Sequence, residues 1–257
     1  MQPKRIPILV YHHVYPDDQA AEAGAVAGVI GVSVFTRQLA HVRTQGGQVV
    51  STSAVIDWLR EDKPLPPKAF ALHFDNGWLD TFTVVLPILR DLGWVATCFP
   101  ITRGIVAASA GESAAVRTLT EGNVEKPFMT WQQLGELREN GWEIGGHTHT
   151  HCKAADKHAA EGDGAILEEI ETSHGLFEKN LGQAPDHFAY PSGSRNAHTD
   201  ALLADRYRSL RLWRWDWPIR WTFTDKSTSH LGIECQNIDA RVPDADFEAI
   251  FREAPAG

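Results

Sequence analysis

Residues 142–151 read WEIGGHTHTH, and the interpretation of the whole chain starts from this stretch. Its apolar first half is typical of a short buried strand, after which His147 and His151 follow four residues apart. Two imidazoles at that spacing can bind one metal ion and leave an open position for water. Histidines that alternate at a strand end are also poor core filling. We therefore predict that His147 and His151 are metal ligands.

Other apolar runs with the character of strands lie on both sides of this stretch. They are IPILVY (6–11), FALHF (70–74), WVATCFPI (94–101) and DHFAYP (186–191). The segments between them read as helices. Residues 163–181 are amphipathic and end before Gly182, and Thr130 begins a capping box. Strands that alternate with helices form right-handed β-α-β units on a parallel sheet. We expect an α/β fold in which residues 1–257 form a single distorted (β/α)7-8 barrel with parallel strands.

Polar residues follow several of these runs directly. His12 and His13 follow the first run, and Asp75 with Asn76 follows FALHF. In a barrel of this kind the chemistry lies at the carboxyl ends of the strands, so one shared site is predicted. The Ala-, Gly- and Ser-rich segment 102–127 is longer than an ordinary connection and is expected to be a lid or an insertion beside that site.

The composition limits the classes of function. The chain has 257 residues, 43% of them hydrophobic and 22% charged, which suits one compact domain. A formal net charge of −9 argues against nucleic acid as a partner. No membrane span is apparent, and the first residues carry no signal-peptide pattern. Three widely spaced cysteines indicate no disulfide framework. A cytoplasmic location is expected.

Four segments together resemble the polysaccharide deacetylase superfamily, the NodB-homology carbohydrate esterases. They are VYHHV (10–14), FDNGWLDTF (74–82), MTWQQLGELRENGWEIGGHTHTH (129–151) and FAYPSG (188–193). Their order and spacing also fit, over nearly the whole chain. Deacetylases of poly-N-acetylglucosamine and chitooligosaccharides are members of this kind. The resemblance implies a metal-dependent hydrolase that removes acetate from an N-acetylated amino sugar.

The resemblance also implies roles for individual residues. Asp75 matches the general base, and Asn76 matches the position of a metal ligand beside His147 and His151. Thr148 matches a serine or threonine that orients the histidine loop. A divalent ion is expected, zinc above nickel, cobalt, iron or manganese.

The resemblance does not assign the residue that protonates the departing amine, because the late Leu-x-His motif of the family has no counterpart in LGIECQNIDAR (231–241). His230 and His12 are both candidates. Asp216 is a candidate for the aspartate that tunes the acid. We expect Trp78, Tyr190, Pro191 and Trp215 to contact the sugar.

The chain departs from the family pattern at residue 76, where asparagine replaces aspartate. A neutral amide oxygen is a weaker ligand for a cation than a carboxylate. Two alternatives therefore stay open: a catalytically weakened or inactive sugar-binding protein, and a metal-independent amidohydrolase. The expected substrate is an N-acetylated sugar in oligomeric, nucleotide-linked or lipid-linked form.

Overall fold

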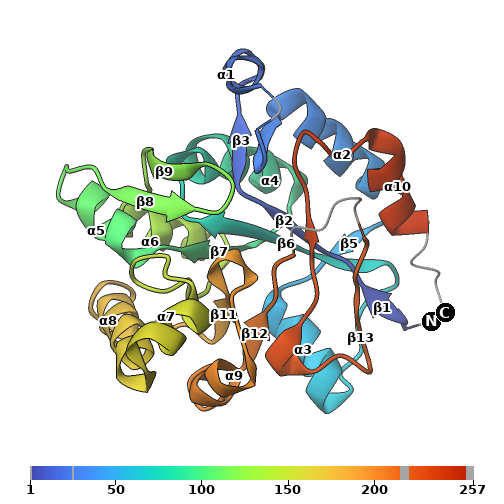
Figure 1. Cartoon of the computed structure of the whole chain (residues 1–257). Helices are drawn as coiled ribbons and strands as arrows, with labels where there is room; N and C mark the ends of the chain where they lie inside the picture. Colours follow the sequence, from blue (N-terminus) through green and yellow to red (C-terminus); the bar gives the residue numbers. More distant parts are fainter. Residues whose placement is uncertain (1, 25, 215–219, 253–257) are drawn as a thin grey trace.

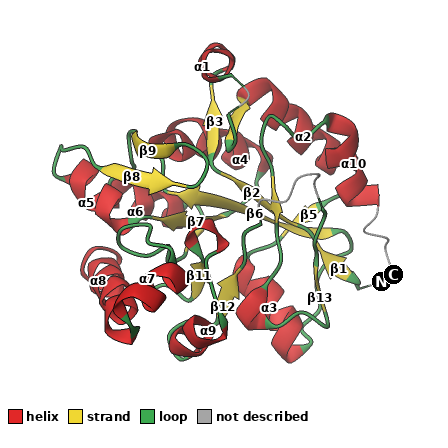
Figure 2. Ribbon diagram, viewed as in Figure 1, coloured by secondary structure: helices red, strands yellow, loops and turns green. Residues whose placement is uncertain are grey.

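The computed structural model describes residues 2–24, 26–214 and 220–252. Its strands lie at the centre and its helices surround them, as Figure 1 and Figure 2 show. The strands are β1 (Arg5–Ile6), β2 (Ile8–Tyr11), β3 (His13–Tyr15), β4 (Val29–Gly31), β5 (Gln48–Val49), β6 (Ala69–Asn76), β7 (Thr97–Pro100), β8 (Ala115–Thr118), β9 (Gly122–Glu125), β10 (Glu143–Ile144), β11 (His187–Ala189), β12 (Ser209–Arg211), β13 (Thr224–Asp225) and β14 (Gln236–Asn237).

Helices fill most of the connections between these strands. They are α1 (Asp17–Ala23), α2 (Val32–Thr44), α3 (Thr52–Glu61), the π-helical turn η1 (Thr81–Val85), α4 (Leu86–Leu92), α5 (Thr102–Ser109), α6 (Trp131–Glu139), α7 (Ala154–Glu161), α8 (Asp163–Leu181), η2 (Pro191–Gly193), α9 (Ala197–Ala204), η3 (His230–Gly232) and α10 (Asp244–Arg252). None of the described helices is long and apolar enough to cross a membrane.

The central strands form a ring of parallel pairs. One sheet has the order β10-β7-β6-β2-β14, and β11 pairs with β12. Two isolated parallel bridges join these parts, one between Gly146 and Phe188 and one between Arg211 and Ile233, just before β14. The ring confirms the predicted α/β class and the distorted parallel barrel.

Strand β6 is the central element of this ring. All eight of its residues are buried, because it has parallel neighbours along both edges and helices outside it. The first strand is interrupted at Pro7, which cannot donate a ladder hydrogen bond, so β1 pairs with β13 and only β2 enters the ring. Each central strand therefore ends at the same edge of the barrel.

Two helices begin or end at the residues that the sequence predicts. Helix α6 begins after Thr130, whose side chain and that of Gln133 form the capping box. Helix α8 ends before Gly182, whose φ of 79° is the left-handed conformation that glycine adopts without strain. It buries Ile166, Ile170 and Phe177 on one face. These helices cover the side of the barrel from which the histidine segment emerges.

Candidate active site

The candidate site lies at the carboxyl ends of the ring strands. Asp75 and Asn76 end β6, Arg211 ends β12, His12 follows β2, and His147 follows β10. The Asp75 carboxylate joins several of them: it pairs with Arg211 and lies 3.9 Å from His12 Nε2. The charge of His147 also acts on this carboxylate, so the predicted meeting of the clusters after β2, β6 and β10 is observed for His12, Asp75 and His147.

The Asp75 and Arg211 pair is fully enclosed. Both carboxylate oxygens accept hydrogen bonds from Arg211 Nη2, at 2.6 and 2.5 Å, and each residue is only 1% exposed. Burial alone would raise the pKa of Asp75, but the charge of Arg211, aided by His147 and His12, outweighs it and lowers the pKa to about 2. Asp75 is therefore a carboxylate at neutral pH, as a general base must be.

Arg211 is a site residue that the sequence prediction missed. Its signal was a single charge inside SLRLW (209–213), a segment otherwise suited to a buried strand. A buried guanidinium requires an anionic partner, because an unpaired charge is costly to bury. The need for a partner could have been inferred from this pattern, although its identity could not.

The histidine tautomers are fixed by backbone carbonyls. His147 Nδ1 lies 2.7 Å from Ala189 O, and His151 Nδ1 lies 2.7 Å from Arg117 O. Because a carbonyl can only accept, each Nδ1 carries the proton and each Nε2 keeps a free lone pair. The ring centroids are 5.0 Å apart. This arrangement is typical of histidines that bind a metal through Nε2.

Asn76 completes the candidate ligand set. Its Oδ1 is buried and has no hydrogen-bond partner among the described residues. An orphaned buried acceptor costs about 1–3 kcal/mol, and a cation would satisfy it. The backbone at Asn76 has a φ of 72°, and that at His151 has a φ of 65°. Left-handed conformations in non-glycine residues gather at functional sites. The donor set of one amide oxygen and two imidazoles fits a divalent ion.

Thr148 lies inside the histidine loop, as expected. Its side chain is 2% exposed and its φ is 62°, while its carbonyl accepts from Thr102 N. That Thr148 orients the histidine loop stays a prediction. Glu169, which was not predicted from the sequence, makes three hydrogen bonds to this loop. Glu169 of α8 accepts from the backbone N–H groups of His149 and Thr150 at 3.0 and 2.9 Å, and from Thr150 Oγ1 at 2.7 Å.

A cavity of about 490 Å³ opens beside His151. Its wall is formed by the hairpin of β8 and β9, by the histidine loop and the start of α7, and by Ser192. The segment 102–127, expected to be a lid or an insertion, thus folds as α5 and this hairpin. Arg117 of the hairpin supplies the carbonyl that holds His151. Closure of the segment over the site stays a prediction.

Two predicted sugar contacts require correction. Trp78 is fully buried, with its ring against His13 at 4.9 Å and Phe128 at 4.3 Å between centroids. Tyr190 is also fully buried, and its hydroxyl donates to Asp200 at 2.8 Å. Its backbone N–H donates to Arg211 O. Both side chains therefore support the fold and present no surface to a sugar. Pro191 is buried beside Ser192, and its contact with substrate stays a prediction.

The two candidates for the general acid differ in position. His12 has a side chain that is 17% exposed and lies beside Asp75. His230 is the start of η3, which packs on β12 and on α3, and the charge that acts on it is that of Arg60. The role of His230 as the general acid stays a prediction. Trp215 and Asp216 lie outside the described residues.

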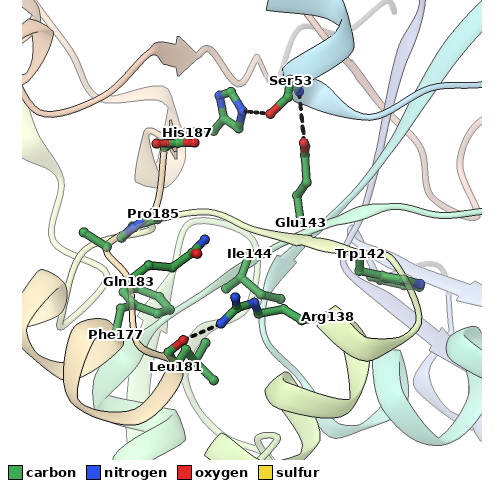
Figure 3. A pocket seen from close by; sticks show the side chains of 12 residues that line it. Ser53, Arg138, Trp142, Glu143, Ile144, Phe177, Leu181, Gln183, Pro185 and His187 are labelled. Atoms are coloured by element: carbon green, nitrogen blue, oxygen red, sulfur yellow. Dashed lines mark hydrogen bonds between the residues drawn. The ribbon is translucent and has the colours of Figure 1, made fainter.

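A second cavity, of about 160 Å³, lies among β10, β11 and the ends of α3 and α8 (Figure 3). In it Ser53 Oγ lies 2.9 Å from His187 Nε2, and the Ser53 N–H donates to Glu143. Ser209 Oγ lies 2.8 Å from the other ring nitrogen of His187. Both nitrogens are thus engaged by hydroxyl groups. These contacts fix the start of β11, two residues before Ala189.

The comparisons with known proteins agree with this geometry. The family profile described as polysaccharide deacetylase matches residues 62–207. The chain is 31% identical over 139 residues to the poly-beta-1,6-N-acetyl-D-glucosamine N-deacetylase of Escherichia coli (strain K12), over 54% of this chain and 20% of that protein. It therefore spans about a fifth of the length of that relative.

Solved structures share the fold along the whole chain. The Streptococcus pyogenes deacetylase PplD, in complex with acetate, has a TM-score of 0.76 and 21% identity, with 98% of each chain covered. IcaB from Ammonifex degensii has a TM-score of 0.76 and 20% identity, again over 98% of each chain. This chain belongs to the polysaccharide deacetylase family, whose members are hydrolases that act on carbon–nitrogen bonds.

Proposed function

We propose that the protein is a metal-dependent N-deacetylase that hydrolyses the acetamide of an N-acetylated amino sugar and releases acetate. The observation that carries this proposal is the donor set beside Asp75: two imidazoles with free Nε2 atoms and the unpartnered Oδ1 of Asn76. The name of the Escherichia coli relative supports the substrate class. The sugar would be part of a glycan or of a glycan precursor, oligomeric, nucleotide-linked or lipid-linked.

The metal would be held by Asn76, His147 and His151. When bound, such an ion polarises the acetamide carbonyl and lowers the pKa of a water molecule toward neutrality. Asp75 takes the proton of the attacking water, because it is ionised at neutral pH. Arg211 holds the carboxylate in one orientation through both of its oxygens. A backbone N–H near Tyr190 would face the oxyanion, and that of Tyr190 itself is already engaged.

His12 delivers the proton to the departing amine in this mechanism. Burial lowers its pKa to about 4, against the opposing effect of Asp75, so His12 is neutral before the reaction. It must therefore receive a proton before it can donate one. Asp75 is the nearest acid once it has taken the proton from water. Its Oδ2 lies 3.9 Å from His12 Nε2, so the two groups must close to hydrogen-bond distance, or one water must bridge them, for the proton to pass. The proton removed from water thus reaches the amine through His12.

Asn76 decides between this function and its alternative. A neutral ligand leaves the cation with more of its charge and binds it more weakly than aspartate does. If the binding is too weak, the barrel would bind sugar without hydrolysis. The partnerless Asn76 Oδ1 is the observation that keeps a metal in the proposal.

The test compares the natural protein with Asn76→Asp and His147→Ala. Metal content is measured by elemental analysis after equilibration with zinc, and acetate release is followed on N-acetylglucosamine oligomers. We expect turnover and a metal ion at this site in the natural protein, about tenfold or more tighter binding of that ion in Asn76→Asp, and loss of turnover and of one equivalent of metal in His147→Ala.

Each opposing result has one meaning. Acetate release found only in Asn76→Asp, together with one more equivalent of metal than in the natural protein, would replace the proposal with a sugar-binding role. Full turnover in excess EDTA would instead indicate a metal-independent amidohydrolase. Unchanged activity of His147→Ala would contradict the assigned ligands.

A further inference from the structure

A second group of potential metal ligands lies on the helices beside the barrel. His158 of α7, Asp163 at the start of α8 and His198 of α9 come from three separate helices, and their ligand atoms all lie within 4.8 Å of one another. Helix α7 packs against both α8 and α9 (Figure 1). None of the three residues belongs to the candidate active site.

The three side chains converge on one point. His158 Nε2 lies 2.9 Å and His198 Nε2 lies 2.8 Å from the same oxygen, Asp163 Oδ1. The two imidazole rings are stacked, with centroids 4.4 Å apart and planes at 28°. The two Nε2 atoms lie within 4.8 Å of each other, close enough to bind one ion after a small adjustment.

The spacing is close to that of a zinc site. With bonds of about 2.0–2.1 Å, tetrahedral ligands lie roughly 3.3 Å from each other. The observed contacts of 2.8 and 2.9 Å therefore need to open by only about half an ångström to admit an ion. The side chains of His198 and Asp163 are 52% and 51% exposed, which leaves water access to a fourth position.

Two imidazoles and one carboxylate suit zinc or a neighbouring transition metal better than calcium or magnesium, which prefer oxygen ligands. We propose that His158, Asp163 and His198 form a second binding site for a transition metal ion of the zinc type, which fastens α7, α8 and α9 together.

The placement gives this site a consequence for the catalytic cavity. Of the residues of α7, Ala154 is the buried one, so apolar packing holds this helix weakly. Helix α7 follows His151 closely, and its Ala155 N–H donates to Ser194 Oγ in the turn that precedes α9. Lys153, Asp156 and Ser192 line the cavity beside His151. An ion that joins α7 to α9 therefore also fixes two walls of that cavity.

The experiment uses zinc chloride as the probe. Protein stripped with EDTA is titrated with zinc in competition with a chromophoric chelator, for the natural chain and for His198→Ala. His198 is half exposed, so its removal should leave the fold intact, which circular dichroism verifies. We expect His198→Ala to bind one equivalent of zinc fewer than the natural protein. The control His41→Ala removes a histidine elsewhere and should bind as many equivalents as the natural chain.

A double variant that lacks both proposed active-site histidines distinguishes zinc bound at the second site from zinc bound at the active site. In His147→Ala/His151→Ala, one equivalent should remain and should disappear when His198→Ala is added. This difference of one equivalent is expected even if the active site binds no metal, so failure of the proposed function would not imitate failure here. Zinc should also raise the melting temperature in this background only while His198 is present. Equal zinc uptake with and without His198 would overturn the proposal.

Discussion

In the proposed mechanism Asp75 is the general base, and its pairing with Arg211 determines its protonation state. Removal of one partner from a buried ion pair leaves an uncompensated charge and costs about 3–5 kcal/mol. We expect Arg211→Met to lose this much free energy of unfolding in chemical denaturation. The double variant Asp75→Asn/Arg211→Met should be more stable than Arg211→Met, because no charge is left alone. Equal stability of Arg211→Met and the natural protein would contradict the pairing.

Arg211 also sets the pH range over which Asp75 can act as a base. Its charge is the main influence that lowers the pKa of Asp75 to about 2, below the ordinary value of 3.8. Without it, burial raises the pKa, so the base is protonated at higher pH. In a variant that folds, Arg211→Gln, the acid limb of kcat/KM should move to higher pH. A limb at the same pH as in the natural protein would show that Arg211 does not tune the base.

The proximity of two site residues could be predicted where they are close in the sequence, and not where they are far apart. His147 and His151 lie four apart, so a shared ligand role could be predicted from the sequence, and the structure brings their rings together at 5.0 Å between centroids. Arg211 and Asp75 are 136 residues apart, and only the closure of the ring brings them together. Trp78 was expected to contact the sugar, but its ring packs between His13 and Phe128, and no local pattern in the sequence shows this burial.

Among the elements, α8 supports the loop of the proposed metal site through Glu169. The carboxylate accepts three hydrogen bonds from the loop that carries His147 and His151, the two proposed ligands. Loss of such supporting contacts typically lowers metal affinity about 10–100-fold. We expect Glu169→Ala to show a loss in this range, measured by zinc competition, and Glu168→Ala on the exposed face of the same helix to show none. An unchanged affinity in Glu169→Ala would mean that the loop keeps its shape without α8.

Elements with strong periodic or capping signals were predicted, and short ones were not. Helix α8 and the Thr130 cap of α6 follow from local chemistry. The hairpin of β8 and β9 has an Ala-, Gly- and Ser-rich surrounding sequence that resembles a loop. Strand β12 has three residues, too few for a periodic pattern, and its place is set by pairing with β11.

At the scale of the whole molecule, the alternation of strands and helices predicted a parallel barrel, but the way it closes was not predictable. Closure depends on two isolated bridges, between Gly146 and Phe188 and between Arg211 and Ile233. Each joins segments far apart in the sequence and carries no local signal. The same closure encloses a set of histidines inside the barrel, and this set makes the stability of the molecule depend on pH.

Four buried histidines and one partly buried histidine have a pKa below the ordinary value of 6.5, chiefly through burial; they are His73, His147, His151 and His187, and His12. Above pH 6.5 they are neutral in both the folded and the unfolded chain, so their contribution to stability is fully present. As the pH falls, the unfolded chain binds protons that the folded chain excludes. Each histidine then lowers the free energy of unfolding by up to about 1.4 kcal/mol per pH unit. For His12 the loss ends near its folded pKa of about 4.

Denaturation in EDTA at pH 7.5, 6.5 and 5.5 should therefore show a falling free energy of unfolding. The interval lies above the range in which carboxylates such as Asp75, whose pKa is lowered to about 2, begin to matter. His73→Gln should reduce the slope by up to about 1.4 kcal/mol per pH unit, because it removes one excluded proton. A free energy that stays constant from pH 7.5 to 5.5 would mean that the barrel takes up these protons while folded, and that its interior is more open to water than its packing indicates.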